Sequence, residues 1–220
     1  MTKAELAKLI DHTALGPETG RAAVEKVCAE AIEHGFYAVC VPPPYVALAK
    51  SILRDTGVLV GTTIGFPHGQ HKPEVKAFEA ARAVADGADE VDMVVDVASL
   101  KEGDRARVRA DIRAVREAAP KPVVLKVILE CCLLSDAEKV LGAKLCQEAG
   151  ADFVKTSTGF STGGATVEDV ALLRRTVGQA LGVKASGGIR DWATALSMIE
   201  AGASRIGASK SVQILAGAPD

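Results

Sequence analysis

Short apolar runs alternate with amphipathic segments along the whole chain. Runs rich in apolar and β-branched residues are typical of buried strands, whereas apolar residues spaced three or four positions apart indicate helices. The apolar runs predict eight strands, at residues 9–12, 37–41, 59–65, 90–95, 123–129, 152–156, 183–186 and 205–208. The clearest helical segments lie between them, at residues 20–34, 73–86, 104–118 and 136–149. This pattern predicts an α/β protein.

A glycine recurs where a helical segment passes into an apolar run. It is found at Gly35, Gly87, Gly150 and Gly202. Glycine just after a helix readily adopts the left-handed conformation that ends it, so we expect each of these residues to separate a helix from a strand.

Eight strands alternating with helices favour a closed barrel over an open doubly wound sheet. The dinucleotide-binding pattern Gly-x-Gly-x-x-Gly does not follow the first strand, which weakens that alternative. We therefore expect a single (β/α)8 TIM barrel over residues 1–220, with a short helix at the N-terminus.

Composition narrows the classes of partner. The 220 residues carry a formal net charge of -2, which supplies no broad cationic surface for nucleic acid or an anionic membrane. The chain has no signal-peptide pattern and no apolar run of membrane-spanning length, so we expect a cytoplasmic protein. Its five cysteines are odd in number and lack Cys-x-x-Cys spacing, so neither a disulfide framework nor a zinc knuckle is indicated.

Four consecutive predicted strands contain a charged residue within the apolar run. These residues are Asp92, Lys126, Lys155 and Lys184, spaced 34, 29 and 29 positions apart. Each spacing is about the length of one strand–helix unit, so we expect them at similar heights on neighbouring strands. A side chain facing the helices would bury its charge unpaired. All four are therefore expected to point into the barrel mouth.

Such a cluster can activate a lysine amine. An ordinary lysine has a pKa of about 10.4, so roughly one amine in 2,500 is unprotonated at pH 7. A second ammonium about 4 Å away disfavours protonation by about 4 kcal/mol at an effective dielectric constant of 20. Three cations against one anion do not neutralise each other, which favours a Schiff-base amine over a structural ion-pair network. Asp92 would be available for proton transfer.

Small residues follow the last two predicted strands, at Gly187 and Gly188 and at Gly207 and Ser209. At candidate helix N-termini, backbone N–H groups can approach an anion closely, and these two loops of TIM barrels frequently bind phosphate. The loop at residues 158–164 is a third candidate. The alternative for each segment alone is an ordinary tight turn.

Two segments are the most specific, residues 153–160 around Lys155 and residues 182–190 around Lys184. Residues 10–13, 39–42, 65–67, 90–94 and 125–130 support them. As an ordered set, they resemble the deoxyribose-phosphate aldolase family over nearly the whole chain. The resemblance implies a class I aldolase that reversibly cleaves 2-deoxy-D-ribose 5-phosphate into D-glyceraldehyde 3-phosphate and acetaldehyde, with no metal or organic cofactor. It also suggests a homodimer.

The resemblance assigns roles to individual residues. Lys155 would form the Schiff base, Lys184 would lower its pKa, and Asp92 would relay protons. Asp11 and Lys126 would lie around these three. Cys40 ends the second predicted strand, where its side chain could face the same barrel mouth; we expect a packing role for it, with attack by reactive aldehydes as a further hypothesis. The phosphate would contact Gly187, Gly188, Gly207 and Ser209, with Gly159, Phe160 and Ser161 closing the other side.

The chain departs from the family pattern at a few positions. Cys131 replaces a usual threonine, Lys210 replaces a common small residue, and no terminal tyrosine is present. The first change affects hydrogen bonding near the site, and the second either attracts phosphate or is simply solvated.

Three other readings stay open. His68 and His71 suggest a metal-dependent aldolase, although their place in a loop with glycine and proline, and a total of only four histidines, favour solvated residues. Transaldolase-like enzymes share the Schiff-base chemistry, but they do not explain the segment at residues 155–159. A noncatalytic phosphosugar-binding barrel would use the lysines only to hold an anion.

Overall fold

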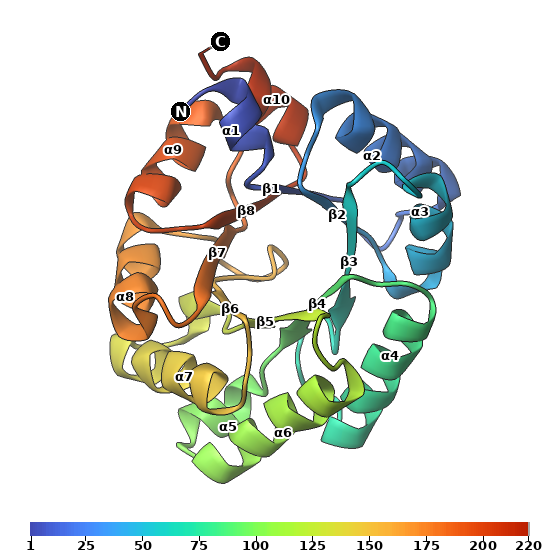
Figure 1. Ribbon diagram of the computed structural model, residues 1–220. Coiled ribbons are helices and arrows are strands. Elements are labelled where there is room, and N and C mark those ends of the chain that lie inside the picture. Colours follow the sequence, from blue (N-terminus) through green and yellow to red (C-terminus); the bar gives the residue numbers. More distant parts are fainter. Residues whose placement is uncertain (220) are drawn as a thin grey trace.

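The computed structural model describes residues 1–219, in which eight parallel strands close into a barrel in sequence order (Figure 1). The last strand pairs with the first and leaves no open edge. The strands are β1 (Ile10–Thr13), β2 (Ala38–Cys40), β3 (Leu59–Ile64), β4 (Glu90–Val94), β5 (Val124–Ile128), β6 (Phe153–Lys155), β7 (Gly182–Ser186) and β8 (Arg205–Ala208). All eight predicted strands are confirmed, with shifts of at most one residue at their ends.

Helices surround the barrel (Figure 1). They are α1 (Lys3–Ala7), α2 (Arg21–His34), α3 (Val46–Ile52), α4 (Pro73–Ala85), α5 (Val97–Lys101), α6 (Arg105–Ala118), α7 (Asp136–Glu148), α8 (Val167–Val177), α9 (Trp192–Glu200) and α10 (Ser211–Ala216), with short 3-10 helices η1 (Pro43–Tyr45) and η2 (Cys131–Leu133). The predicted TIM barrel with a short N-terminal helix is confirmed. The four clearest predicted helices correspond to α2, α4, α6 and α7.

The recurring glycines end helices as expected. Gly35 caps α2 with φ 65°, and Gly87, Gly150 and Gly202 follow α4, α7 and α9 with φ 101°, 84° and 112°. Glycine adopts positive φ without the steric cost of a side chain, so the chain can turn directly into the next strand. These turns at glycine set where β2, β4, β6 and β8 begin.

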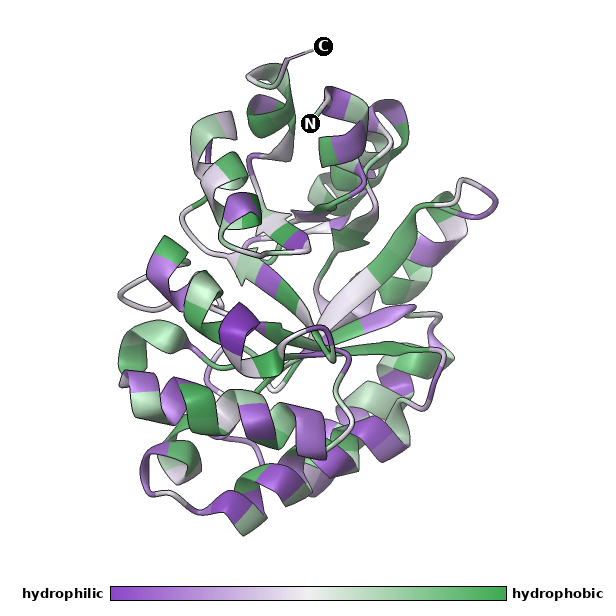
Figure 2. Cartoon of the chain, turned by 60° about the vertical axis from the view of Figure 1, so that its left-hand side comes forward, coloured by the Kyte–Doolittle hydropathy of each residue, from purple (hydrophilic) through white to green (hydrophobic). Residues whose placement is uncertain are grey.

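The two faces of the barrel wall differ in polarity. Val91 and Met93 flank Asp92 on β4, and all three are fully buried. Successive residues of a strand point to opposite faces, so the apolar neighbours pack under the helices while the charged residue points into the barrel. Figure 2 shows the same alternation, with green apolar strands interrupted by purple polar segments. The barrel interior is therefore the polar part of the core.

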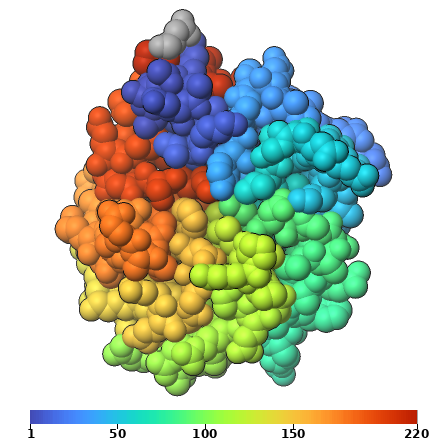
Figure 3. All heavy atoms as spheres, in the orientation of Figure 1, coloured from blue at the N-terminus to red at the C-terminus, as the bar shows by residue number. Residues whose placement is uncertain are grey.

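The two ends of the described chain lie together. The backbone N–H of Lys3 donates to the carbonyl of Pro219 at 3.2 Å, and α1 contacts α10. In Figure 3 the first, blue residues adjoin the last, red ones on the surface. None of the helices within residues 1–219 is long and apolar enough to cross a membrane.

A tight contact inside the barrel gives a stability prediction. Gly182 begins β7, and a Cβ atom there would lie 2.2 Å from Cε1 of Phe153. We expect Gly182→Ala to lower the free energy of unfolding by about 1–3 kcal/mol through overpacking. Urea denaturation measures this change. Gly20→Ser is the control, because a Cβ atom there comes no closer than 4.0 Å to another residue and serine is a good N-cap for α2. Equal stability of Gly182→Ala and the parent would contradict the packing argument.

Candidate active site

The four charged strand residues lie together inside the barrel. Asp92, Lys126, Lys155 and Lys184 come from β4, β5, β6 and β7, and each is at most 3% exposed. Asp92 pairs in register with Lys126, and Lys155 pairs with Lys184. Lys126, however, is in register with Phe153, two residues before Lys155. The expectation of one common height was therefore too simple, and the tilt of the strands brings the two pairs into contact.

Asp92 binds all three lysines. Its Oδ2 accepts from Nζ of Lys155 at 2.7 Å and from Nζ of Lys184 at 2.8 Å. Its Oδ1 accepts from Nζ of Lys126 at 2.8 Å. Burial alone would raise the pKa of Asp92, but the three ammonium groups hold it well below its ordinary value. Asp92 is therefore a carboxylate that touches every amine of the cluster.

Three more charged residues extend the cluster toward the beginning of the strands. Glu90 accepts from Lys126 at 2.6 Å, and Arg205 donates to Asp11 at 2.9 Å and to Glu90 at 3.2 Å. Asp11 also accepts from Lys184 at 2.5 Å. We call the seven residues the charge network: Asp11, Glu90, Asp92, Lys126, Lys155, Lys184 and Arg205.

Glu90 and Arg205 were missed by the sequence analysis. Each is the first residue of its strand, where a charge is ordinarily solvated, yet both are buried here. The guanidinium carbon of Arg205 lies 3.7 Å from the ring centroid of Tyr37, a cation–π contact that covers it with an aromatic face. Glu90 lies two residues before Asp92 on the same face of β4, but spacing along one strand does not show that Arg205 of β8 would be its partner.

These additions correct the expected charge count. Instead of three cations against one anion, the network holds four cations and three carboxylates. With every group charged, one positive charge is left over. This excess positive charge is smaller than the one expected from three cations and one anion, but it is still positive.

Of the three lysines, Lys155 is the one whose pKa is lowered, so it gives up the excess proton most readily. Burial lowers its pKa, and Lys184 lowers it further, against the opposing effect of Asp92. Burial also acts on Lys126 and Lys184, but their carboxylate partners raise both pKa values above the ordinary lysine value. Among the residues described, Lys155 pairs with one carboxylate, whereas Lys184 pairs with two and Lys126 with three. When Lys155 loses its proton, the charge network becomes neutral overall.

Gly207 gives Lys184 the room it occupies. A Cβ atom at Gly207 would lie 2.9 Å from Cε of Lys184 and 3.0 Å from Cβ of Ser186. The end of the lysine side chain therefore passes close to the backbone of the neighbouring strand β8. Any side chain at position 207 would displace the amine that lies beside Lys155.

Lys155 borders a cavity of about 770 Å³ at the carboxyl ends of the strands. Six of the residues predicted to bind phosphate line the same cavity: Gly159, Phe160, Gly187, Gly188, Gly207 and Ser209. Lys26, Arg190 and Lys210 add positive charge to its lining. The amine of Lys155 and glycine loops that carry nearby cations thus line one cavity.

Other expectations about this cavity need correction. Ser161 lines a neighbouring hollow of about 300 Å³ instead. Gly187 and Gly188 do not begin a helix, because α9 starts only at Trp192. They adopt φ values of 87° and 80° in a loop, where the absence of side chains leaves space for an anion.

Cys40 and Cys131 are buried near the site. Burial raises the pKa of Cys40 to about 11, so its thiol stays protonated at neutral pH and is a poor nucleophile toward aldehydes. Its position on β2, 2% exposed, agrees with packing. Cys131 donates its backbone N–H to the carbonyl of Thr156 at 2.8 Å, a contact that does not depend on its side chain.

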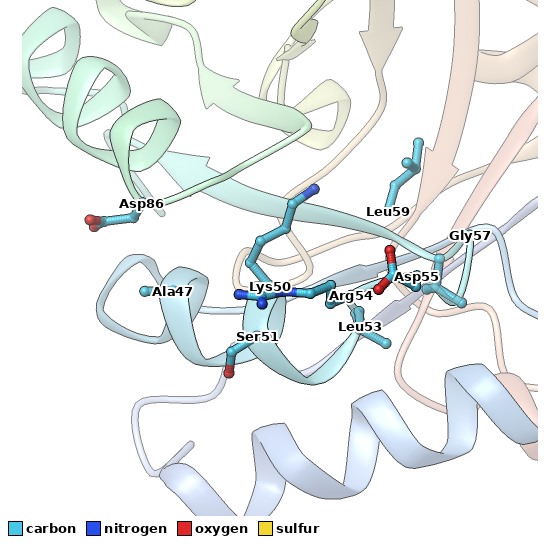
Figure 4. A pocket seen from close by; sticks show the side chains of 10 residues that line it. Ala47, Lys50, Ser51, Leu53, Arg54, Asp55, Gly57, Leu59 and Asp86 are labelled. Carbon is cyan, nitrogen blue, oxygen red and sulfur yellow. The ribbon is translucent and has the colours of Figure 1, made fainter.

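The two histidines considered as metal ligands lie apart from the charge network. His68 lines the hollow that contains Ser161, and His71 is exposed. Within residues 1–219, no group of three or more histidine, cysteine or acidic side chains is arranged to hold a metal ion. A separate hollow of about 500 Å³ lies at the opposite end of the barrel, between the end of α3 and the start of β3 (Figure 4). Its Lys50 is paired with Asp89 at 2.7 Å.

Comparison with known proteins places this arrangement in a family. Residues 6–217 match the model of the DeoC/LacD family aldolases. A deoxyribose-phosphate aldolase of Streptococcus suis is 58% identical over 214 residues, covering 97% of each chain. One from Clostridium perfringens is 55% identical over 217 residues, covering 99% of this chain and 97% of its own.

A solved structure agrees with the sequence comparisons. The tetrameric deoxyribose phosphate aldolase of Aeropyrum pernix superposes with a TM-score of 0.91 at 35% identity, over 98% of this chain and 91% of its own. The range matched by the family model, residues 6–217, includes all eight strands and the positions of the charge network. The chain therefore belongs to the DeoC/LacD family of aldolases.

Proposed function

We propose that the chain is a class I aldolase that reversibly cleaves 2-deoxy-D-ribose 5-phosphate into D-glyceraldehyde 3-phosphate and acetaldehyde through a Schiff base on Lys155. The main support is that Lys155, the lysine of the charge network with a lowered pKa, borders the cavity that the glycine loops line. The names of the most similar relatives support the substrate.

The charge network can supply the proton transfers that this reaction needs. The neutral amine of Lys155 attacks the substrate aldehyde, and loss of water gives a protonated imine. Removal of the proton from the 3-hydroxyl then breaks the C2–C3 bond: C3 becomes the aldehyde of the departing D-glyceraldehyde 3-phosphate, and the electron pair of the bond moves into the imine to form an enamine. Protonation of the enamine and hydrolysis release acetaldehyde and restore the amine. Asp92 lies 2.7 Å from Lys155 and 2.8 Å from Lys184, so one carboxylate can exchange protons with both.

The substrate phosphate would contact the loops that share the cavity with Lys155. Gly187 and Gly188 can present backbone N–H groups to an anion, while Arg190 and Lys210 contribute positive charge. The substituted Lys210 would then strengthen the attraction of phosphate. This assignment rests on the cavity lining and on the resemblance.

A noncatalytic phosphosugar-binding barrel is the main competing function. It would use the same cations but would need no neutral amine. The lowered pKa of Lys155 beside the raised pKa of Lys184 favours catalysis, because a site that only holds an anion gains from protonating both.

We further propose that residues 1–220 act as one domain, in the cytoplasm, as a homodimer. The closed barrel and the family resemblance support these proposals, although the Aeropyrum pernix relative is a tetramer. Light scattering of the purified protein measures the oligomeric state directly.

Borohydride trapping tests the Schiff base. We expect sodium borohydride with acetaldehyde to ethylate Lys155, to be detected by peptide mass spectrometry, and to abolish cleavage of 2-deoxyribose 5-phosphate. The Lys155→Met variant should be inactive and should take up no adduct in that peptide. Full turnover with unmodified Lys155 would exclude the mechanism, and loss of turnover with a chelator would favour a metal-dependent reaction.

The charge count predicts opposite shifts in pH dependence. Glu90→Gln removes a negative charge, which disfavours protonated Lys155, so the acidic limb of kcat/KM should move to lower pH. Arg205→Met removes a positive charge, so the limb should move to higher pH. The pH profiles of both variants measure these shifts.

The double variant Glu90→Gln/Arg205→Met is the control, since it restores the original balance of charge. Its acidic limb should lie between those of the single variants. Shifts of the same sign in both single variants would show that lost packing, rather than charge, governs Lys155.

A further inference from the structure

Glu130 is a buried carboxylate that takes no part in the charge network. It follows β5 and is 4% exposed. Its backbone has φ 59° and ψ 64°, a left-handed conformation that costs free energy in a residue with a side chain. Asp55 is the one other non-glycine residue with positive φ in the described chain. Such a conformation persists where surrounding contacts require it.

The contacts of Glu130 are with the loop after β6. Its Oε2 accepts from the hydroxyl of Thr158 at 2.5 Å, and its Oε1 accepts from the backbone N–H of Thr158 at 3.3 Å. The Thr158 hydroxyl in turn accepts from the N–H of Phe160 at 3.0 Å. One carboxylate from β5 thus orients both Thr158 and, through its hydroxyl, Phe160.

The other contacts of this loop are made by side chains: the ring of Phe160 packs edge-on against Phe66 at 5.4 Å, and Cys132 contacts Ser161 and Thr162 at 3.5 and 3.8 Å. Within the described chain, residues 159–164 make no backbone-to-backbone hydrogen bond. Thr158 and Phe160 line both the 770 Å³ cavity and the 300 Å³ hollow, whereas Glu130 lines only the hollow. The segment from Thr158 to Phe160 therefore forms the wall between the two spaces, and Glu130 holds it from the side away from Lys155.

We propose that Glu130 is a positioning residue, which fixes Thr158 and Phe160 so that the loop backbone faces the phosphate of the substrate. This inference rests on the proposed function. It also explains why a strained backbone is retained at position 130, since the left-handed turn aims the carboxylate at the loop.

Steady-state kinetics test the inference. We expect Glu130→Ala and Thr158→Val each to raise KM for 2-deoxyribose 5-phosphate about tenfold, because each removes a hydrogen bond to a charged acceptor. Their kcat values, and kcat/KM for unphosphorylated 2-deoxyribose, should change much less. Thr158→Ser keeps the hydroxyl and should retain the parent KM. The double variant should be no worse than either single variant, since both remove one interaction.

Two variants separate positioning from a general loss of stability. Asp104→Ala removes the N-cap of α6, where Asp104 accepts from the N–H of Arg107 at 3.0 Å, and should lower stability with KM unchanged. Glu130→Gly should be more stable than Glu130→Ala, because glycine relieves the left-handed strain, yet it should show the same raised KM.

Amide hydrogen exchange gives a readout that does not need turnover. Glu130→Ala should speed exchange of the peptide that contains residues 158–160, while Asp104→Ala should not. Unchanged exchange, or an equal loss of kcat/KM on phosphorylated and unphosphorylated substrates, would overturn the inference. An inactive parent whose exchange still depends on Glu130 would instead refute the proposed function and leave the positioning contact supported.

Discussion

The candidate site depends on the pairing of three carboxylates with four cations in the closed interior of the barrel. Charges removed from water are very unfavourable unless they are paired. Asp92 accepts hydrogen bonds from three lysine amines at once. Asp11 and Glu90 pair with Arg205, whose guanidinium is covered by the ring of Tyr37. One positive charge remains, and Lys155, with one carboxylate partner, can lose its proton at the least cost. The same constraint thus keeps the interior charges paired and lowers the pKa of one amine.

Lys155 differs in its surroundings from another fully buried lysine. Lys76 on α4 is 0% exposed and lies outside the barrel wall, where it donates to Asp111 at 2.7 Å and to the carbonyl of Val94 at 2.9 Å. That pair is balanced, one cation with one anion, and Lys76 borders none of the cavities described above. What distinguishes Lys155 is the combination of an unbalanced network, few anionic contacts and access to a cavity.

Much of the fold and part of the site could be predicted from the sequence. Apolar runs and helix-ending glycines depend on local preferences, so the eight strands, the barrel and the four inward charges were predictable. Glu90 and Arg205 were not, because a charge at the start of a strand is usually solvated, and only barrel closure buries both against each other. The two-residue offset between Lys126 and Lys155 depends on strand tilt, which sequence spacing does not encode. The left-handed turn at Glu130 carries no local signal, since the residue types that favour this conformation are glycine, asparagine and aspartate.

The central claim, that Lys155 holds the least stable proton of the charge network, is tested most directly by nitrogen-15 NMR of the lysine side chains. The ligand-free protein would carry labelled lysine amines, with signals assigned from Lys155→Met, Lys126→Met and Lys184→Met variants. We predict that Lys155 titrates below the ordinary lysine pKa of about 10.4, while Lys126 and Lys184 stay protonated above it. Titration of Lys155 at or above that value, or of Lys184 before Lys155, would contradict the account.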